Sequence, residues 1–170
     1  MLKAVRHRQF PENKDQRQPW NIQRLSEFGC RNEESKSGCL HGCGSDHGLS
    51  SFGDTQTFRR KLVAECPAIL GTVPIYDAIV YYNKALKDIT SREWIDIFKM
   101  HAEDGVDFMT IHCGINRSTA DRFKAMKRQM NIVSRGGSLI FAWMEATGCE
   151  NPFFEYYDEI LDILMNMTLL

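Results

Sequence analysis

The stretch Ile132-Val-Ser-Arg-Gly-Gly-Ser138 has the residue types of an anion-binding junction. We expect it to be the end of a strand that runs into a helix, because an apolar segment follows it. Glycines at such a junction let backbone N–H groups approach an anion, and Arg135 can contact a phosphate through two N–H groups at once. Ser134, Arg135 and Gly136 are therefore candidates for binding a phosphorylated ligand.

His112 is a second candidate because it follows a short apolar run, Phe108 to Ile111, that predicts a buried strand. A predicted helix and Gly105 precede this strand. Helix, glycine, strand and a polar residue at the strand's end form the pattern of an α/β barrel. Histidine can hydrogen-bond or transfer protons near neutral pH, although a purely structural histidine fits this position equally well.

Tyr76 follows a further predicted strand at 69–73, near its C-terminal end. Pro74 suits the first turn of a helix, which we expect over 75–84 because apolar residues recur there at helical spacing. Tyrosine can stack on a planar ligand and donate a hydrogen bond. The pattern alone favours a simpler interpretation, in which Tyr76 is an aromatic residue of the core or its rim.

The remaining elements must position these three groups. Thr90 can cap the helix that precedes His112, with Glu93 completing a capping box, and His101 in that helix is interpreted as a residue without chemistry. The three or four strand–helix units predict an α/β fold, either a smaller sandwich or an incomplete (β/α)8 barrel of the TIM type. The expected helices span 57–65, 75–84, 90–104, 116–129, the junction through 147, and 153–164, and the expected parallel strands lie near 69–73, 107–112 and 131–134.

Residues 1–48 differ from residues 49–170 in composition and in the periodicity of their apolar residues. The first part is polar and aperiodic and predicts a poorly ordered leader, with little regular structure before about residue 45. The second part is expected to be the partial barrel domain. Cys39 and Cys43, with Cys30 and His47 nearby, could suggest a metal site, but their spacing matches no standard zinc or iron–sulfur pattern. We therefore predict no metal ligands in this chain.

Composition and charge limit the partners of the protein. The chain has 170 residues and a formal net charge of −1, so charge favours neither nucleic acid nor an anionic membrane as a partner. No apolar run reaches membrane-spanning length, and the N-terminus lacks the apolar core of a signal peptide. The six scattered cysteines suit reduced thiols. We expect a cytoplasmic protein.

Five segments between about Leu49 and Asp162 resemble the phosphomethylpyrimidine synthase family, in order and with compatible spacing. The family's core is a (β/α)8 barrel. The resemblance implies conversion of 5-aminoimidazole ribonucleotide to 4-amino-5-hydroxymethyl-2-methylpyrimidine phosphate in thiamine biosynthesis, by a radical mechanism that uses S-adenosylmethionine and a 4Fe-4S cluster, with zinc nearby. The segments are Leu-Ser-Ser-Phe-Gly-Asp54, Gly-Thr-Val-Pro-Ile-Tyr-Asp-Ala78, Gly-Val-Asp-Phe-Met-Thr-Ile-His-Cys-Gly114, Ile-Val-Ser-Arg-Gly-Gly-Ser138 and Glu-Asn-Pro-Phe-Phe-Glu-Tyr-Tyr157.

Carried over position by position, the resemblance implies that Tyr76, His112, Ser134, Arg135 and Gly136 contact the imidazole ribonucleotide or its product. It assigns no catalytic residue here. The family's cluster motif, Cys-x-x-Cys-x-x-x-x-Cys, and its zinc-binding histidines have no match in the chain. We therefore expect a fragment of a carbon–carbon lyase that is inactive alone. In the full-length family the resemblance also allows a homodimer.

A frame shift would explain the unmatched ends of the chain. Asp46-His47-Gly48 can be coded GAT CAT GGA, and an offset of one base then gives Ile-Met-Asp, which the family has before Leu-Ser-Ser. Offset codons for 20–25 and 165–170 also produce family-like residues. Our hypothesis is that roughly 17–48 and 164–170 are out-of-frame translation.

Two other functions stay open on sequence alone. The chain could be a standalone α/β domain that binds a phosphorylated ligand through Ser134–Gly136. It could also be a metal-binding protein that uses the N-terminal cysteines and histidine. Downstream coding sequence separates the enzyme from the binding domain, because only the enzyme's gene continues into the zinc and cluster motifs.

Overall fold

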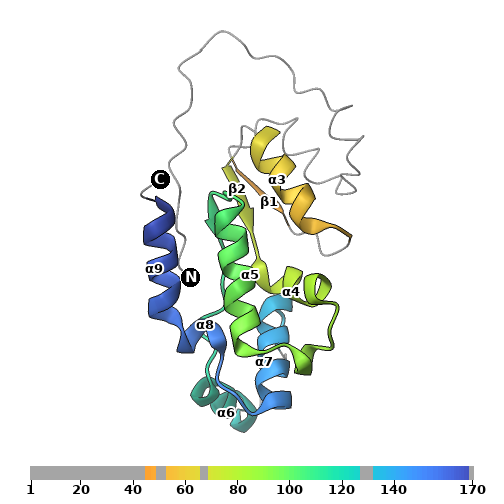
Figure 1. Ribbon diagram of the computed structural model, residues 1–170. Helices are drawn as coiled ribbons and strands as arrows, with labels where there is room; N and C mark the ends of the chain where they lie inside the picture. Colours follow the sequence, from red (N-terminus) through yellow and green to blue (C-terminus); the bar gives the residue numbers. More distant parts are fainter. Residues whose placement is uncertain (1–44, 49–52, 66–68, 127–131, 169–170) are drawn as a thin grey trace.

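The computed structural model describes residues 45–48, 53–65, 69–126 and 132–168, and these form a helix-rich α/β fold around a small parallel sheet (Figure 1). The strands are β1 (Ser45–Gly48), β2 (Ile69–Thr72) and β3 (Phe108–Met109), in the order β1-β2-β3. Both pairings are parallel, with Ser45 opposite Ile69 and Gly71 opposite Phe108. The parallel pairing predicted for the segments near 69–73 and 107–112 is confirmed.

The helices connect and cover these strands. Helix α3 lies between β1 and β2 in the chain, and α4, the 3-10 helix η1 and α5 lie between β2 and β3. The other helices follow β3. Their bounds are α3 (Thr55–Glu65), α4 (Pro74–Tyr82), η1 (Leu86–Asp88), α5 (Ser91–Glu103), α6 (Arg117–Ala125), α7 (Arg135–Thr147), α8 (Pro152–Glu155) and α9 (Tyr157–Thr168).

Helix α5 is the centre of the apolar core and runs in front of the sheet in Figure 1. Its Trp94 side chain is fully buried and meets Trp143 of α7 and Phe153 of α8 edge to face, with ring centroids 6.4 and 6.2 Å apart. Aromatic pairs in this geometry add stabilisation beyond the area that they bury. The core therefore ties α7, which carries the candidate anion site, to the helix next to the sheet.

The start and end of two helices follow the predicted signals. The Thr90 side chain accepts a hydrogen bond from Glu93 N, and the Glu93 side chain accepts one from Thr90 N, so the predicted capping box is confirmed. Gly148 ends α7 in the left-handed conformation at φ 73°, where glycine is favoured. These caps fix the ends of the two helices that carry Trp94 and Trp143.

Three predictions about the elements differ from the structure. The predicted strand near 131–134 is wrong where the structure describes it, since residues 132–134 are not in a strand. Ser134 instead caps α7, because its hydroxyl accepts from Gly137 N and stops the extended chain. The helix predicted over 153–164 is broken at Tyr156 into α8 and α9.

The third difference is strand β1. Its residues fall at the end of the expected leader and were not predicted as a strand. The earlier part of that leader, with Cys30, Cys39 and Cys43, lies outside the described residues. No helix in the described ranges is both long and apolar enough to cross a membrane.

Candidate functional site

The first turn of α7 provides the backbone of the candidate site. Ser134 is its N-cap, and the Ser134 Oγ accepts a hydrogen bond of 3.2 Å from Gly137 N. The first N–H groups of a helix have no partner within the helix, and they form its positive end. Gly136 and Gly137 are both buried in this turn. The junction named from the sequence is therefore the N-terminus of a helix, and its contact with an anion stays a prediction.

His112 packs directly against this turn. Its Nε2 lies 3.2 Å from Ser134 Oγ. A Cβ added to Gly136 would lie 2.3 Å from His112 Cε1, which is closer than any real contact of that kind. Only glycine at position 136 lets the imidazole ring approach the helix N-terminus in this way.

Tyr76 reaches the same place from α4. The guanidinium carbon of Arg135 lies 4.7 Å from the centroid of the Tyr76 ring, which is a cation–π contact. The five residues named from the sequence thus meet in the folded chain: Tyr76 with Arg135, His112 with Ser134, and Gly136 with His112. They come from three segments that are far apart in the sequence.

Asn151 holds the turn that follows His112. Its side chain is fully buried, and its Nδ2 donates to the carbonyl oxygens of His112 and Ile115 at 2.9 and 2.5 Å. Asn151 also caps α8 through a bond from Phe153 N. Sequence reasoning gave Asn151 no role. An asparagine directly before Pro152 was a signal for a helix cap, but nothing in the sequence showed its contact with the site.

Burial decides the charge of His112. Loss of solvent lowers the pKa of the His112 imidazole below its usual value, so the ring is neutral at neutral pH. Its Nδ1 is buried without a hydrogen-bond partner among the residues that the structure describes. A buried polar atom that lacks a partner is costly. A ligand could bond to Nδ1 only if the ring or its neighbours moved, because this atom is closed to solvent.

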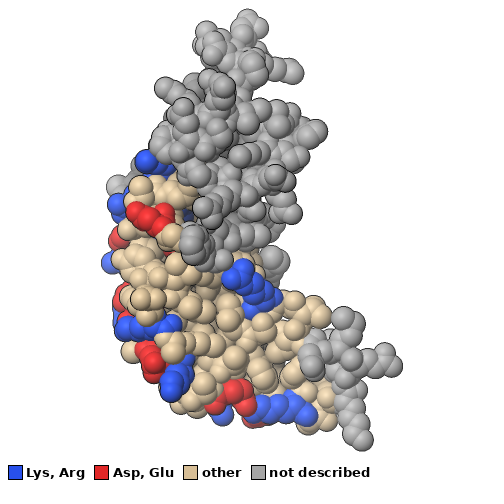
Figure 2. Space-filling view, turned by 90° about the vertical axis from the view of Figure 1, so that its right-hand side faces the viewer, with Lys and Arg blue, Asp and Glu red and all other residues tan. Residues whose placement is uncertain are grey.

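Figure 2 shows where charge lies on one face of the protein. Lys and Arg side chains lie along the left edge and the lower end of that face beside Asp and Glu, and a further group of Lys or Arg atoms lies near its middle, surrounded by other residue types. The charged side chains on this face are therefore distributed in separate small groups.

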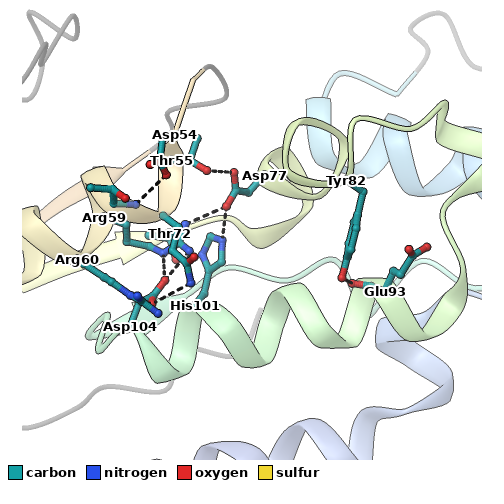
Figure 3. A network of polar contacts seen from close by, with 12 residues as sticks. Asp54, Thr55, Arg59, Arg60, Thr72, Asp77, Tyr82, Glu93, His101 and Asp104 are labelled. Carbon is teal, nitrogen blue, oxygen red and sulfur yellow. Dashed lines mark hydrogen bonds and ion pairs between the residues drawn. The ribbon is translucent and has the colours of Figure 1, made fainter.

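A second polar cluster, which we call the Asp77 network, lies between α3, β2, α4 and α5 (Figure 3). His101 Nδ1 lies 2.9 Å from Thr72 Oγ1, and His101 Nε2 lies 3.0 Å from Asp77 Oδ2. Arg59 donates to Asp77 Oδ2 at 2.9 Å and to Asp104 Oδ2 at 2.8 Å. His101 therefore has a buried polar role, which its interpretation as a helix residue without chemistry did not include.

Asp77 is ionised in this cluster. Burial alone would raise the pKa of the Asp77 carboxyl, but hydrogen bonds from His101, Thr55 and Arg59 hold it below its usual value. A carboxylate only accepts, so His101 Nε2 donates to Asp77 and His101 Nδ1 accepts from the Thr72 hydroxyl. Burial lowers the pKa of His101, which keeps this neutral form.

Comparison with known proteins places the chain in a family. The model of the Radical SAM ThiC family matches residues 26–169. The chain belongs to this family. Phosphomethylpyrimidine synthases of Clostridium acetobutylicum, Clostridium novyi and Pelotomaculum thermopropionicum are 64%, 61% and 60% identical to it over 115 residues, which are 68% of this chain. The resemblance inferred from the five segments is confirmed.

The chain is much shorter than those relatives. The match covers 26%, 26% and 27% of the three proteins, so the chain spans about a quarter of their length. The matched family region extends back to residue 26, within the expected leader. Membership of the Radical SAM ThiC family implies an iron–sulfur cluster and S-adenosylmethionine as cofactors of the whole protein.

The described residues do not fit a ligand set for that cluster or for zinc. No group of three or more His, Cys, Asp or Glu side chains within the described ranges could hold a metal ion. Cys113 and Cys149 are the cysteines in those ranges, and both are free thiols. With their own groups, the residues of the candidate site offer a helix N-terminus, an arginine and a neutral imidazole.

Proposed function

We propose that this chain forms the part of a phosphomethylpyrimidine synthase that holds 5-aminoimidazole ribonucleotide. Ser134, Arg135 and Gly136 bind the phosphate at the start of α7, and His112 and Tyr76 contact the rest of the ligand. The observation that carries this proposal is the meeting of these five residues from three separate segments. The reaction of the whole enzyme then yields 4-amino-5-hydroxymethyl-2-methylpyrimidine phosphate for thiamine.

Each residue has a physical role in this proposal. The first turn of α7 offers backbone N–H groups and the positive end of the helix to the phosphate. Arg135 adds a charged, planar donor pair, and its contact with Tyr76 limits the conformations that it must lose on binding. The neutral His112 can donate or accept at Nδ1, which has no described protein partner. These groups bind and orient; turnover requires other parts of the enzyme.

We also infer that the sheet is part of a (β/α)8 barrel in the longer protein. Its parallel strands lie side by side in chain order, and helices separate them in the sequence. A barrel is built from parallel strands in this order, each followed by a helix. The division into a leader at 1–48, partly out of frame, and a domain at 49–170 stays a prediction.

The cofactors of the proposed enzyme are S-adenosylmethionine and a 4Fe-4S cluster, which supply radicals, and zinc. Their ligands would come from segments outside the described residues. A cytoplasmic location, a homodimer and the absence of nucleic-acid and membrane partners also stay predictions.

Isothermal titration calorimetry of the 170-residue chain tests the binding function. The chain is titrated with 5-aminoimidazole ribonucleotide, with the riboside that lacks the phosphate, and with inorganic phosphate. We expect the ribonucleotide to bind and the riboside to bind much more weakly. Lys99→Ala serves as a control for Arg135→Ala, because it removes an equal charge from the exposed face of α5. Equal affinity for ribonucleotide and riboside would reject the phosphate role.

A turnover assay separates the synthase fragment from a complete enzyme. After anaerobic reconstitution with iron and sulfide, the chain is supplied with ribonucleotide, S-adenosylmethionine and a reductant. We expect no pyrimidine phosphate above a control without protein. Product together with about four irons per chain, as in a 4Fe-4S cluster, would show that the ligands were missed. Coding sequence that lacks the zinc and cluster motifs downstream would favour the standalone phosphate-binding domain.

A further inference from the structure

The junction between β2 and α4 is fixed by contacts from neighbouring elements and not by a helix cap of its own. Within the described residues, no side chain caps the first turn of α4, and Pro74 at its start has no N–H to bond. Strand β2 ends at Thr72, and only Val73 lies between it and the start of this helix at Pro74. Tyr76, whose ring faces Arg135, lies in the uncapped turn. The position of that ring therefore depends on contacts made by neighbouring elements.

His101 provides the first of these contacts. It reaches from α5 to both sides of the junction, with 2.9 Å to Thr72 Oγ1 and 3.0 Å to Asp77 Oδ2 (Figure 3). Thr72 is the last residue of β2, and Asp77 directly follows Tyr76 in α4. One neutral imidazole thus joins the end of the strand to the first turn of the helix.

Helix α3 provides the remaining contacts. Thr55 donates to Asp77 Oδ1, while Arg59 and His101 both donate to Asp77 Oδ2. Arg59 also donates to the fully buried carboxylate of Asp104, at the end of α5. Both oxygens of Asp77 are therefore fixed by donors from two different helices.

The role of such a buried polar cluster is to fix the relative positions of its elements more than to raise the free energy of unfolding. Taking charged groups out of water is costly, and well-packed apolar residues of similar volume often stabilise a protein as much. A hydrogen-bonded ion pair differs from apolar packing because it has directions and allows few arrangements. The Asp77 network therefore restricts how α4 can sit relative to β2 and α5.

We propose that His101 is a positioning residue of the ligand site. By bonding Thr72 and Asp77 it holds the first turn of α4, so that the Tyr76 ring lies against the Arg135 guanidinium. The importance of this contact for a phosphorylated ligand rests on the proposed function. The placement of the ring itself can be measured without a ligand.

Fluorine NMR of the 170-residue chain labelled with fluorotyrosine reports on that ring directly. Tyr76→Phe identifies the Tyr76 resonance among those of the five tyrosines. Arg135→Ala shows how far this resonance moves when the contact with the guanidinium is lost. His101→Phe then removes both hydrogen bonds of the imidazole and keeps an aromatic ring of similar size.

We expect His101→Phe to move the Tyr76 resonance toward its position in Arg135→Ala. Affinity for 5-aminoimidazole ribonucleotide should fall about tenfold, which corresponds to about 1.4 kcal/mol. His101→Gln keeps a donor for Asp77 and should restore part of both effects. The control is Ile160→Ala, which opens a cavity at a buried position of α9 outside the Asp77 network. It should destabilise the fold but leave the Tyr76 resonance and the affinity of the folded protein unchanged.

Thr72→Val covers the case in which His101→Phe does not fold, because it removes only one hydroxyl from the network. It should produce a smaller shift of the same sign. A Tyr76 resonance that stays in place in folded His101→Phe, or in Thr72→Val, would overturn the positioning role. If the unaltered chain bound no ribonucleotide, the proposed function would fail, while movement of the resonance would still support the role of His101.

Discussion

Replacement of Gly136 by alanine separates ligand binding from stability. The new Cβ would lie 2.3, 2.8 and 2.9 Å from three atoms of the His112 ring, so the imidazole must move. Movement of the ring breaks its 3.2 Å contact with Ser134. The ring is a side chain that can turn aside, so the backbone of α7 can stay where it is. The site is then disturbed while the fold is kept.

Two opposing effects set the change in stability. Overpacking in a tight site costs about 1–3 kcal/mol. Glycine in a helix destabilises the fold relative to alanine by roughly 0.5–1 kcal/mol, so the substitution regains part of this free energy. We expect the free energy of unfolding to fall by about 0–2.5 kcal/mol, the difference between these terms. Ribonucleotide affinity should fall at least about tenfold, because the added methyl group blocks the approach to the helix N-terminus and displaces His112.

Gly137→Ala is the matched control in the same turn. Its Cβ would lie 3.2 Å from Ile115 Cδ1 and 3.3 Å from Ser134 Cβ, which small adjustments can relieve. Urea unfolding gives the stability of both variants, and titration calorimetry gives their ribonucleotide affinity. Gly136→Ala that binds like the unaltered chain, or Gly137→Ala that loses binding equally, would refute the assignment of His112 and Gly136 to one site.

Three further predictions test the charges of the protein. Arg135→Ala should weaken ribonucleotide binding by about 1.5–3 kcal/mol in titration calorimetry, the range for a hydrogen bond to a charged group; unchanged affinity would reject its phosphate contact. Burial lowers the pKa of His101 and His112 below 6.5, so the unfolded chain binds more protons and stability should fall as pH drops from about 6.5 toward the lowered values. Urea unfolding across that range should show the slope, and His101→Gln should reduce it; a slope that is unchanged would contradict the assignment. Arg59→Met should cost about 3–5 kcal/mol in urea unfolding because it removes the buried cation that Asp77 and Asp104 share. Arg60→Ala, at a mostly exposed side chain, should have little effect; similar losses in both would show that burial does not decide the difference.

Local signals in the sequence predicted the helices well. The capping box at Thr90 and the glycine at 148 depend on residues within one turn, and the structure has both. Strand β1 was missed because its sequence, Ser-Asp-His-Gly, lacks the apolar pattern of a strand; pairing with β2 defines it. The strand predicted near 131–134 failed for the opposite reason, because Ser134 caps a helix where apolar residues had suggested an extended chain.

The site was predictable only in part. Tyr76, His112 and the glycine junction could be named from residue type and resemblance, and the structure brings them together. His101 was missed because helical periodicity places it on a face of α5 without saying what that face meets. Its partners Thr72 and Asp77 are 29 and 24 residues away in the sequence. A contact of that range depends on the tertiary packing of β2, α4 and α5.

The order of the sheet also has a consequence during synthesis. Leu70 of the central strand donates its N–H to the Asp107 carboxylate, and its carbonyl accepts from Asp107 N. These partners are 37 residues apart, so at about 5–20 residues per second the ribosome leaves one edge of β2 without that partner for about 2–7 s. A nascent strand with an open edge can pair with another chain. Slower translation between the codons for Leu70 and Asp107 should therefore increase aggregation of the newly made protein, and chaperones that cover extended segments should reduce it.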